Sequence, residues 1–404
     1  MQDAEILANW PPPHFDVKVT WKRTGEGVRH GTAYELLEGT FRTPCFGRVY
    51  DALPVESRSA RVQLLLPKQE AQRRACVVHL AGTGDHHFTR RLNLGFPLLA
   101  QGIATMALES PFYGARRPPG QAGAKLMHVS DLLVLGRATI EESLCLLNWL
   151  QLQGFQRLGM SGFSMGGVHA CMVAGLFPGD LACVPLLAPR SAAVAFCDGA
   201  LWDATAWKPL TTDEDEAHHD ITRTIHEAAQ PSAITAAATR ILEQDVEKLL
   251  REGWAAGDSA ASSQAAAGPT LGTRMASEGQ QYARADGSAP SSSGRRNGID
   301  AAERQLGQLW RMRGKLKREA ARMRLAQVLE TYTDVTRFPR PQRPDAAVLV
   351  AATHDAYVSK QSVLELAEHW AGSEVRWVAG GHVSAFLMQQ DAFRTAIRDS
   401  IGRL

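Results

Sequence analysis

Short apolar runs alternate with longer segments of helical periodicity along most of the chain. The runs that predict strands lie at residues 62–67, 75–82, 103–111, 156–160, 181–189, 346–353 and 374–380. The segments that predict helices lie at residues 129–150, 359–372 and 391–404, and Ser130 is the expected N-cap of the first. Alternation of this kind predicts parallel strands joined by helical crossovers. The predicted fold class is α/β, with a mostly parallel central sheet flanked by helices.

The alternation stops between residues 190 and 344. Helical periodicity is visible at 217–253 and again at 301–333, where Asp300 and Glu303 resemble a capping box. Residues 255–298 are rich in Ala, Ser and Gly, so we expect a disordered tether there. The expected organisation is a core of residues 1–189 and 345–404, in which 1–40 is an N-terminal extension. Residues 190–344 would form a helical cap or lid inserted between the sixth and seventh strands.

The composition limits the classes of protein and the compartments that fit this sequence. The 404 residues include 44 Lys and Arg against 42 Asp and Glu, a formal net charge of +2, which argues against a surface that binds nucleic acid along its whole extent. The 6 cysteines contain no CxxC pair, as expected inside the cell. The first residues show neither a basic apolar leader nor a spanning segment. These features predict an intracellular, cytoplasmic protein.

The strongest chemical signal is the sequence Gly162-Phe163-Ser164-Met165-Gly166. It lies where a predicted strand meets a predicted helix, which is the context of a nucleophile elbow. A serine in such a turn needs a histidine as base and an acid to orient that histidine. Asp355 and His382 each follow a predicted strand, in the order acid then histidine. The pattern predicts a catalytic triad of Ser164, Asp355 and His382.

A triad of this kind requires backbone N–H groups that stabilise the developing oxyanion. Met165 follows the nucleophile and is one expected donor; Gly82 or Thr83, after the strand at 75–82, is the other. The candidate substrate-contacting residues are Asp85, His86, Arg90, Tyr113 and Arg116. A metal site at His79, Asp85, His86 and His87 is a weaker interpretation, because adjacent histidines point apart; no metal or cofactor is expected.

Two groups of basic residues have both a functional and a structural interpretation. Arg90, Arg91, Arg116 and Arg117 follow two neighbouring strands and form a cationic rim for a phosphate or carboxylate, unless they are only solvated surface. Seven basic residues crowd positions 311–324 among apolar ones. That segment predicts either peripheral contact with an anionic membrane or a solvated helix face.

The chain also resembles the α/β-hydrolase superfamily and, within it, the alpha/beta-hydrolase-domain-containing protein 18 family. The resemblance is carried by the strings HLAGTGDHHF, ESPFYGARRP, VSDLLVLG, NWLQLQGFQRLGMSGFSMGG, HDAYVS and GGHVSAFL, and covers residues 40–190 and 345–404. It implies the α/β-hydrolase fold, the same triad, and lipid acyl esters, including phospholipids such as cardiolipin, as substrates. The loop at 81–85 lacks the HGGG string of many esterases, and the N-terminus lacks the leader of animal members. Mitochondrial association is therefore implied by the resemblance alone.

The sequence thus predicts a serine hydrolase that cleaves carboxylic, lipid-like esters through an acyl-enzyme. An acyltransferase with the same triad remains an alternative, because the sequence does not show whether water or an alcohol reaches the acyl group. A non-catalytic ligand-binding protein of the same fold is the second alternative.

Overall fold

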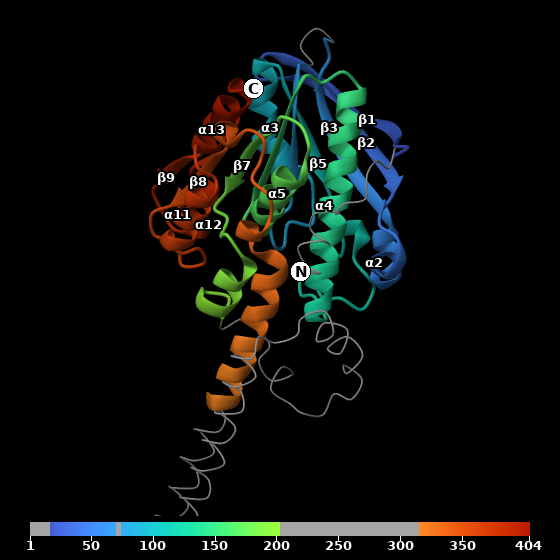
Figure 1. Cartoon of the computed structure of the whole chain (residues 1–404). Coiled ribbons are helices and arrows are strands. Elements are labelled where there is room, and N and C mark those ends of the chain that lie inside the picture. Colours follow the sequence, from blue (N-terminus) through green and yellow to red (C-terminus); the bar gives the residue numbers. More distant parts are fainter. Residues whose placement is uncertain (1–16, 70–73, 203–314) are drawn as a thin grey trace, which may run out of the picture. The chain divides into compact units, whose positions relative to one another are not determined.

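The computed structural model describes residues 17–69, 74–202 and 315–404 (Figure 1). The chain divides into two compact units, Met1–Thr205 with Arg324–Leu404, and Ala206–Met323. All described strands belong to the first unit. Residues 315–333 are helical, in agreement with the end of the helix expected at 301–333. The helix expected at 217–253 and the tether expected at 255–298 lie outside the described residues.

The described strands form one sheet in the order β1-β2-β3-β5-β4-β6-β7-β8-β9. Their bounds are β1 (Thr20–Arg29), β2 (Thr32–Arg42), β3 (Ser59–Pro67), β4 (Ala75–Leu80), β5 (Ile103–Leu108), β6 (Arg157–Phe163), β7 (Ala182–Leu186), β8 (Val348–Ala352) and β9 (Glu374–Val378). Strands β1, β2, β3 and β5 pair antiparallel, and every pair from β5 to β9 is parallel. The fold is therefore the expected mixed α/β sheet.

Helices cover both faces of the sheet. They are α2 (Gly47–Ala52), α3 (Thr89–Gly95), α4 (Val129–Leu152), α5 (Met165–Leu176), α11 (Lys360–His369), α12 (His382–Met388) and α13 (Gln390–Gly402). Leu147 of α4 and Met172 of α5 share an apolar cluster with Val78 of β4, and these helices lie in front of the sheet in Figure 1. Val77, the preceding residue of β4, belongs to the opposite cluster with Phe393 of α13. Successive residues of a strand thus enter two different cores, which explains the continuous apolar runs.

Two local features differ from the sequence interpretation. Residues 20–42, to which no element was assigned, form the hairpin of β1 and β2 at one edge of the sheet. Trp21 of this hairpin packs on Trp149 of α4 with ring centroids 5.3 Å apart. The N-cap of α4 is His128, not Ser130, because Asp131 accepts a hydrogen bond from the His128 N–H at 2.9 Å.

The parallel order brings the carboxyl ends of β4, β5, β6, β8 and β9 to one edge of the sheet. β4 lies between β5 and β6, so the loops that follow these three strands are neighbours. Ligand-binding residues of open α/β sheets gather at this edge. The site is therefore expected in the loops that follow the strands.

Candidate active site

Ser164 occupies a sharp turn between β6 and α5. Its backbone has φ 53° and ψ −116°, a conformation that non-glycine residues rarely adopt. A Cβ on Gly162 would lie 2.3 Å from the carbonyl carbon and oxygen of Gly166, so the turn is too tight for a side chain there. The Ser164 N–H donates to the Leu186 carbonyl at 2.9 Å, which ties the strained residue to β7. These are the features of a nucleophile elbow.

Asp355 and His382 are in direct contact. The His382 Nδ1 lies 2.7 Å from Asp355 Oδ2, and both side chains are more than 90% buried, with exposed fractions of 7% for His382 and 2% for Asp355. The other carboxylate oxygen, Oδ1, accepts the backbone N–H groups of Tyr357 at 2.8 Å and Val358 at 3.0 Å. Because a carboxylate only accepts, this contact places a proton on Nδ1, and in the neutral imidazole Nε2 is then the acceptor.

The aromatic rings around His382 connect it to the elbow. The ring of Phe163, the residue before Ser164, lies 5.0 Å from the imidazole centroid. Tyr357 stacks on the imidazole with centroids 4.8 Å apart and planes at 28°. The imidazole is thereby held against the segment that carries Ser164. Neither ring was predicted from the sequence. Phe163 directly precedes Ser164, and Tyr357 lies two residues after Asp355.

The loop after β4, residues 81–88, lies against the elbow. A Cβ on Gly82 would stand 2.8 Å from the Phe163 carbonyl oxygen, so only glycine permits this approach. The Thr83 hydroxyl is 3.8 Å from Met165 Sδ. The N–H groups of Gly82, Thr83 and Met165 donate no hydrogen bond to any residue in the described ranges. The loop after β4 therefore lies against Phe163 and Met165, the residues on either side of Ser164.

The four arginines of the expected rim divide into an inner and an outer pair. Arg116 is fully buried and forms a bidentate pair with Glu142, with distances of 2.8 and 2.6 Å. Arg91 is buried and pairs with Asp85 at 3.0 Å. Arg90 and Arg117 are exposed, and neither has an ion-pair partner among the described residues. The structure therefore places Arg116 and Asp85 in structural ion pairs, and only Arg90 and Arg117 remain at the surface.

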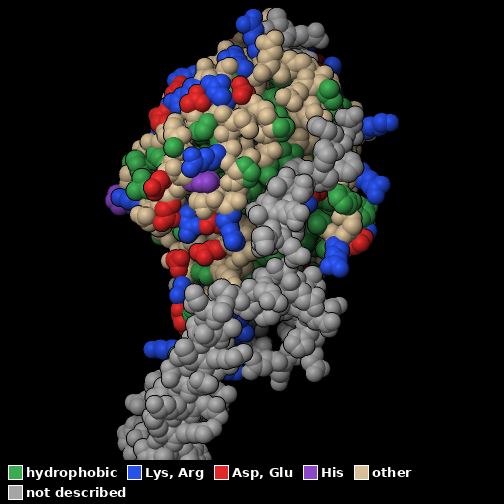
Figure 2. Space-filling model, in the orientation of Figure 1, with side chains coloured by type: hydrophobic (Ala, Val, Ile, Leu, Met, Phe, Trp, Pro, Cys, Tyr) green, Lys and Arg blue, Asp and Glu red, His purple; other side chains and the backbone are tan. Residues whose placement is uncertain are grey.

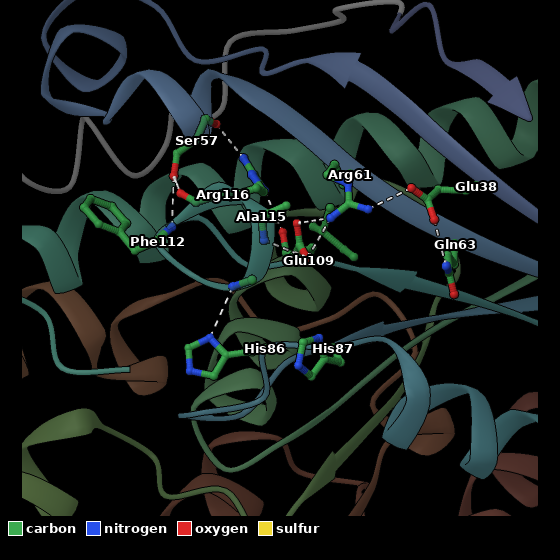
Figure 3. A network of polar contacts seen from close by, with 12 residues as sticks. Glu38, Ser57, Arg61, Gln63, His86, His87, Glu109, Phe112, Ala115 and Arg116 are labelled. Carbon is green, nitrogen blue, oxygen red and sulfur yellow. Dashed lines mark hydrogen bonds and ion pairs between the residues drawn. The ribbon is translucent and has the colours of Figure 1, made fainter. Parts of the chain in front are cut away.

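The other two substrate candidates join the loops after β4 and β5. His86 Nδ1 accepts the Gly114 N–H at 3.2 Å (Figure 3). The His86 ring lies 5.1 Å from that of Tyr113. Tyr113 is 1% exposed, and burial raises the pKa of its phenol to about 12. The Glu109 carboxylate accepts hydrogen bonds from Arg61 and from the Ala115 N–H (Figure 3). No local sequence pattern indicated these contacts.

Among the described residues there is neither a cluster of metal-binding side chains nor a helix that could span a membrane. No group of three or more His, Cys, Asp and Glu side chains among them could hold a metal ion. His79, part of the metal interpretation, is buried in β4, and burial lowers its pKa to about 3. None of the described helices is long and apolar enough to cross a bilayer. Figure 2 shows acidic and basic side chains interspersed over the described part of one face.

Comparisons with known proteins give both similar solved structures and a matching family. Among solved structures, the rice cell wall degrading esterase LipA from Xanthomonas oryzae is 16% identical over 95% of this chain and 97% of its own, with a TM-score of 0.45. The acetyl xylan esterase from Paenibacillus sp. R4 is 12% identical over 97% of this chain and 92% of its own, with a TM-score of 0.44. The sequence profile described as "Alpha/beta hydrolase domain containing 18" matches residues 7–403. The chain therefore belongs to the alpha/beta hydrolase domain containing 18 family, and its fold is that of an α/β-hydrolase.

Proposed function

We propose that this α/β-hydrolase is a serine hydrolase of carboxylic esters. The observation that carries the proposal is the 2.7 Å contact between buried Asp355 and His382, with the imidazole packed on Phe163 beside the strained Ser164. A buried carboxylate that orients an imidazole beside an elbow serine is the arrangement that activates a hydroxyl as a nucleophile.

In the first half of the reaction, Ser164 Oγ bonds to the ester carbonyl carbon while His382 Nε2 takes the hydroxyl proton. The carbonyl electron pair moves onto oxygen, where the N–H groups of Met165 and of Gly82 or Thr83 stabilise it. Each such donor lowers the barrier by about 2.7–4 kcal/mol. The bond to the leaving alkoxide then breaks, and Nε2–H protonates that oxygen.

In the second half, water attacks the acyl-enzyme and His382 Nε2 accepts its proton. The acid product departs as the proton returns to Ser164 Oγ. Asp355 keeps its negative charge throughout and stabilises the imidazolium that forms in each half. In both halves His382 Nε2 takes up the proton and then passes it on, so one side chain carries every proton transfer in this scheme.

The substrate class we propose is a lipid acyl ester. The family resemblance suggests it, and exposed apolar side chains on α12 support it. Val383 and Leu387, one and five residues after the histidine of the triad, are 58% and 65% exposed, and Met388 is 79% exposed. Apolar surface beside an ester-cleaving site favours a substrate with an aliphatic chain. Deacylation of phospholipids falls within this class.

Peripheral contact with an anionic membrane is a further part of the proposal. Lys315, Arg318 and Arg324 are exposed on the helical segment at 315–333. Each basic residue near an anionic leaflet contributes about 1 kcal/mol of attraction. Binding of the purified protein to anionic vesicles that weakens with salt is the expected result; equal binding to neutral vesicles contradicts it.

The test of the proposed function is hydrolysis of a panel of acyl esters by wild type and Ser164→Ala, with products identified by mass spectrometry. We expect release of free acid that Ser164→Ala loses by several orders of magnitude. Transfer of the acyl group to an added alcohol in preference to water would instead make the chain an acyltransferase. The matched control is Ser161→Ala on β6, the strand that leads to Ser164, because the buried Ser161 hydroxyl only donates to the Val184 carbonyl. Equal activity in Ser164→Ala and Ser161→Ala would refute the proposal.

A further inference from the structure

The loop after β5, residues 109–118, is held by hydrogen bonds within it and by bonds to Ser57 and Arg61 outside it. Arg116 donates to the Glu109 carbonyl at 2.6 Å and to the Ser57 carbonyl at 2.7 Å. The Ser57 hydroxyl accepts the Phe112 N–H at 2.9 Å. The Glu109 carboxylate accepts both from Arg61 and from the Ala115 N–H (Figure 3). This loop is therefore a fixed reference against which a neighbouring loop can be positioned.

The loop after β4 carries the proposed donors and contacts the loop after β5 through His86 and Thr83. Nδ1 of His86 accepts the Gly114 N–H at 3.2 Å, and the His86 ring packs on the ring of Tyr113. Burial raises the pKa of the Tyr113 phenol, and the Thr83 side chain and the Gly84 backbone, which lie close enough to oppose this rise, are its neighbours in the loop after β4. The contacts of His86 thus connect, through Tyr113, to the residue whose N–H is a candidate oxyanion donor.

We propose that His86 is a positioning residue for the oxyanion hole: its Nδ1 atom, accepting the Gly114 N–H, locks the loop that carries Gly82 and Thr83 onto the fixed loop after β5. The inference rests on the proposed function, because it assigns His86 a role in that reaction. His86 does not touch the reacting atoms in this account. It acts by keeping the donors where the oxyanion forms, and displacement of a donor by even about 1 Å weakens transition-state stabilisation.

The lock requires an unprotonated Nδ1, since a protonated nitrogen cannot accept the Gly114 N–H. Burial lowers the pKa of His86, and the neighbouring Arg117, His87 and Arg90 side chains lower it further, while Asp85 opposes them. The aromatic face of Tyr113 is the remaining neighbour. A lowered pKa extends the accepting form toward acid, so the lock is present at neutral pH and is lost as pH falls through the pKa of His86.

The chain offers a matched set of variants. His86→Ala removes the acceptor, and His86→Asn retains one, because an amide oxygen can occupy a place similar to Nδ1 and does not titrate. His87→Ala is the control, since the adjacent His87 side chain is exposed and makes no hydrogen bond within the described residues. The measurements are kcat and KM on a neutral short-chain ester across pH, and hydrogen–deuterium exchange of peptides that span 81–88 and 109–118.

We expect His86→Ala to lower kcat by about 10- to 100-fold with KM nearly unchanged, and to speed exchange in both peptides. His86→Asn should retain kcat within about threefold of wild type and show less loss of activity at acid pH, because its amide cannot be protonated in that range. Equal losses in His86→Ala and His86→Asn, or an equal effect of His87→Ala, would overturn the inference. So would a His86→Ala protein with wild-type kcat and exchange. Faster exchange in His86→Ala, when wild type itself cleaves no ester, would leave the loop lock standing and reject the proposed function instead.

Discussion

Substitution of Asp355 by asparagine tests the geometry of the site most closely. Asp355 Oδ1 accepts two backbone N–H groups, from Tyr357 and Val358, so in Asp355→Asn the single amide oxygen stays on that side. The new NH₂ group then faces His382 Nδ1, which also carries a proton. The imidazole must adopt the other tautomer, with the proton on Nε2, and can no longer accept the Ser164 proton.

The expected loss in kcat is about 10⁴-fold, which corresponds to about 5.5 kcal/mol in the activation free energy. The free energy of unfolding should fall by no more than about 3 kcal/mol, the value of one charge-assisted hydrogen bond. The assay is steady-state hydrolysis of a soluble ester, paired with urea unfolding. Asp391→Asn is the control, because the Asp391 side chain is 99% exposed. A folded Asp355→Asn protein with kcat within about tenfold of wild type would show that the assigned roles of Asp355 and His382 are wrong.

Three further predictions concern the elbow and the arginines. Gly162→Ala should abolish soluble expression or esterase activity, because its Cβ would lie 2.3 Å from the Gly166 backbone; a soluble variant with wild-type kcat would contradict the tight turn. Arg116→Met should lower the free energy of unfolding by about 3–5 kcal/mol in urea titrations, and adding Glu142→Gln should restore part of it; no recovery would mean that the ion pair is not the cause. Exchange of Arg90 and Arg117 for Gln should reduce kcat/KM for a phosphorylated ester by about 10- to 100-fold and leave a neutral ester nearly unchanged, whereas equal losses would exclude head-group binding.

The fold and the order of the expected triad could be read from the sequence because both depend on local patterns. Buried parallel strands are continuous apolar runs, and the buried strands β6 and β8 precede Ser164 and Asp355. The strand before His382, β9, is a partly exposed edge strand of five residues. Once the strands are parallel, their carboxyl ends must share an edge, so the loops that carry these residues converge without any knowledge of side-chain contacts.

The roles of the arginines could not be read in this way. Arg116 and Arg117 are adjacent, yet one is fully buried and the other exposed. The difference is set by Glu142, which lies 26 residues away on α4 and forms the buried pair. Such a partner becomes visible only when the chain is folded.

The hairpin of β1 and β2 was not predicted for a different reason. Most side chains of β1 are exposed, so the strand lacks the alternation of a half-buried element. Its structure comes from pairing with β2 and from the packing of Trp21 on Trp149, a contact between segments distant in sequence. Residue propensities and hydrophobic periodicity are local properties, so they do not indicate pairing or contacts between distant segments.

The most direct test of the central claim is to locate the nucleophile with a fluorophosphonate probe and peptide mass spectrometry. We predict a single adduct on the peptide that contains Ser164 in wild type, no adduct in Ser164→Ala, and labelling in His382→Ala that is slower by several orders of magnitude. An adduct on another residue, or undiminished labelling of Ser164→Ala, would contradict the claim that Ser164 is an activated nucleophile.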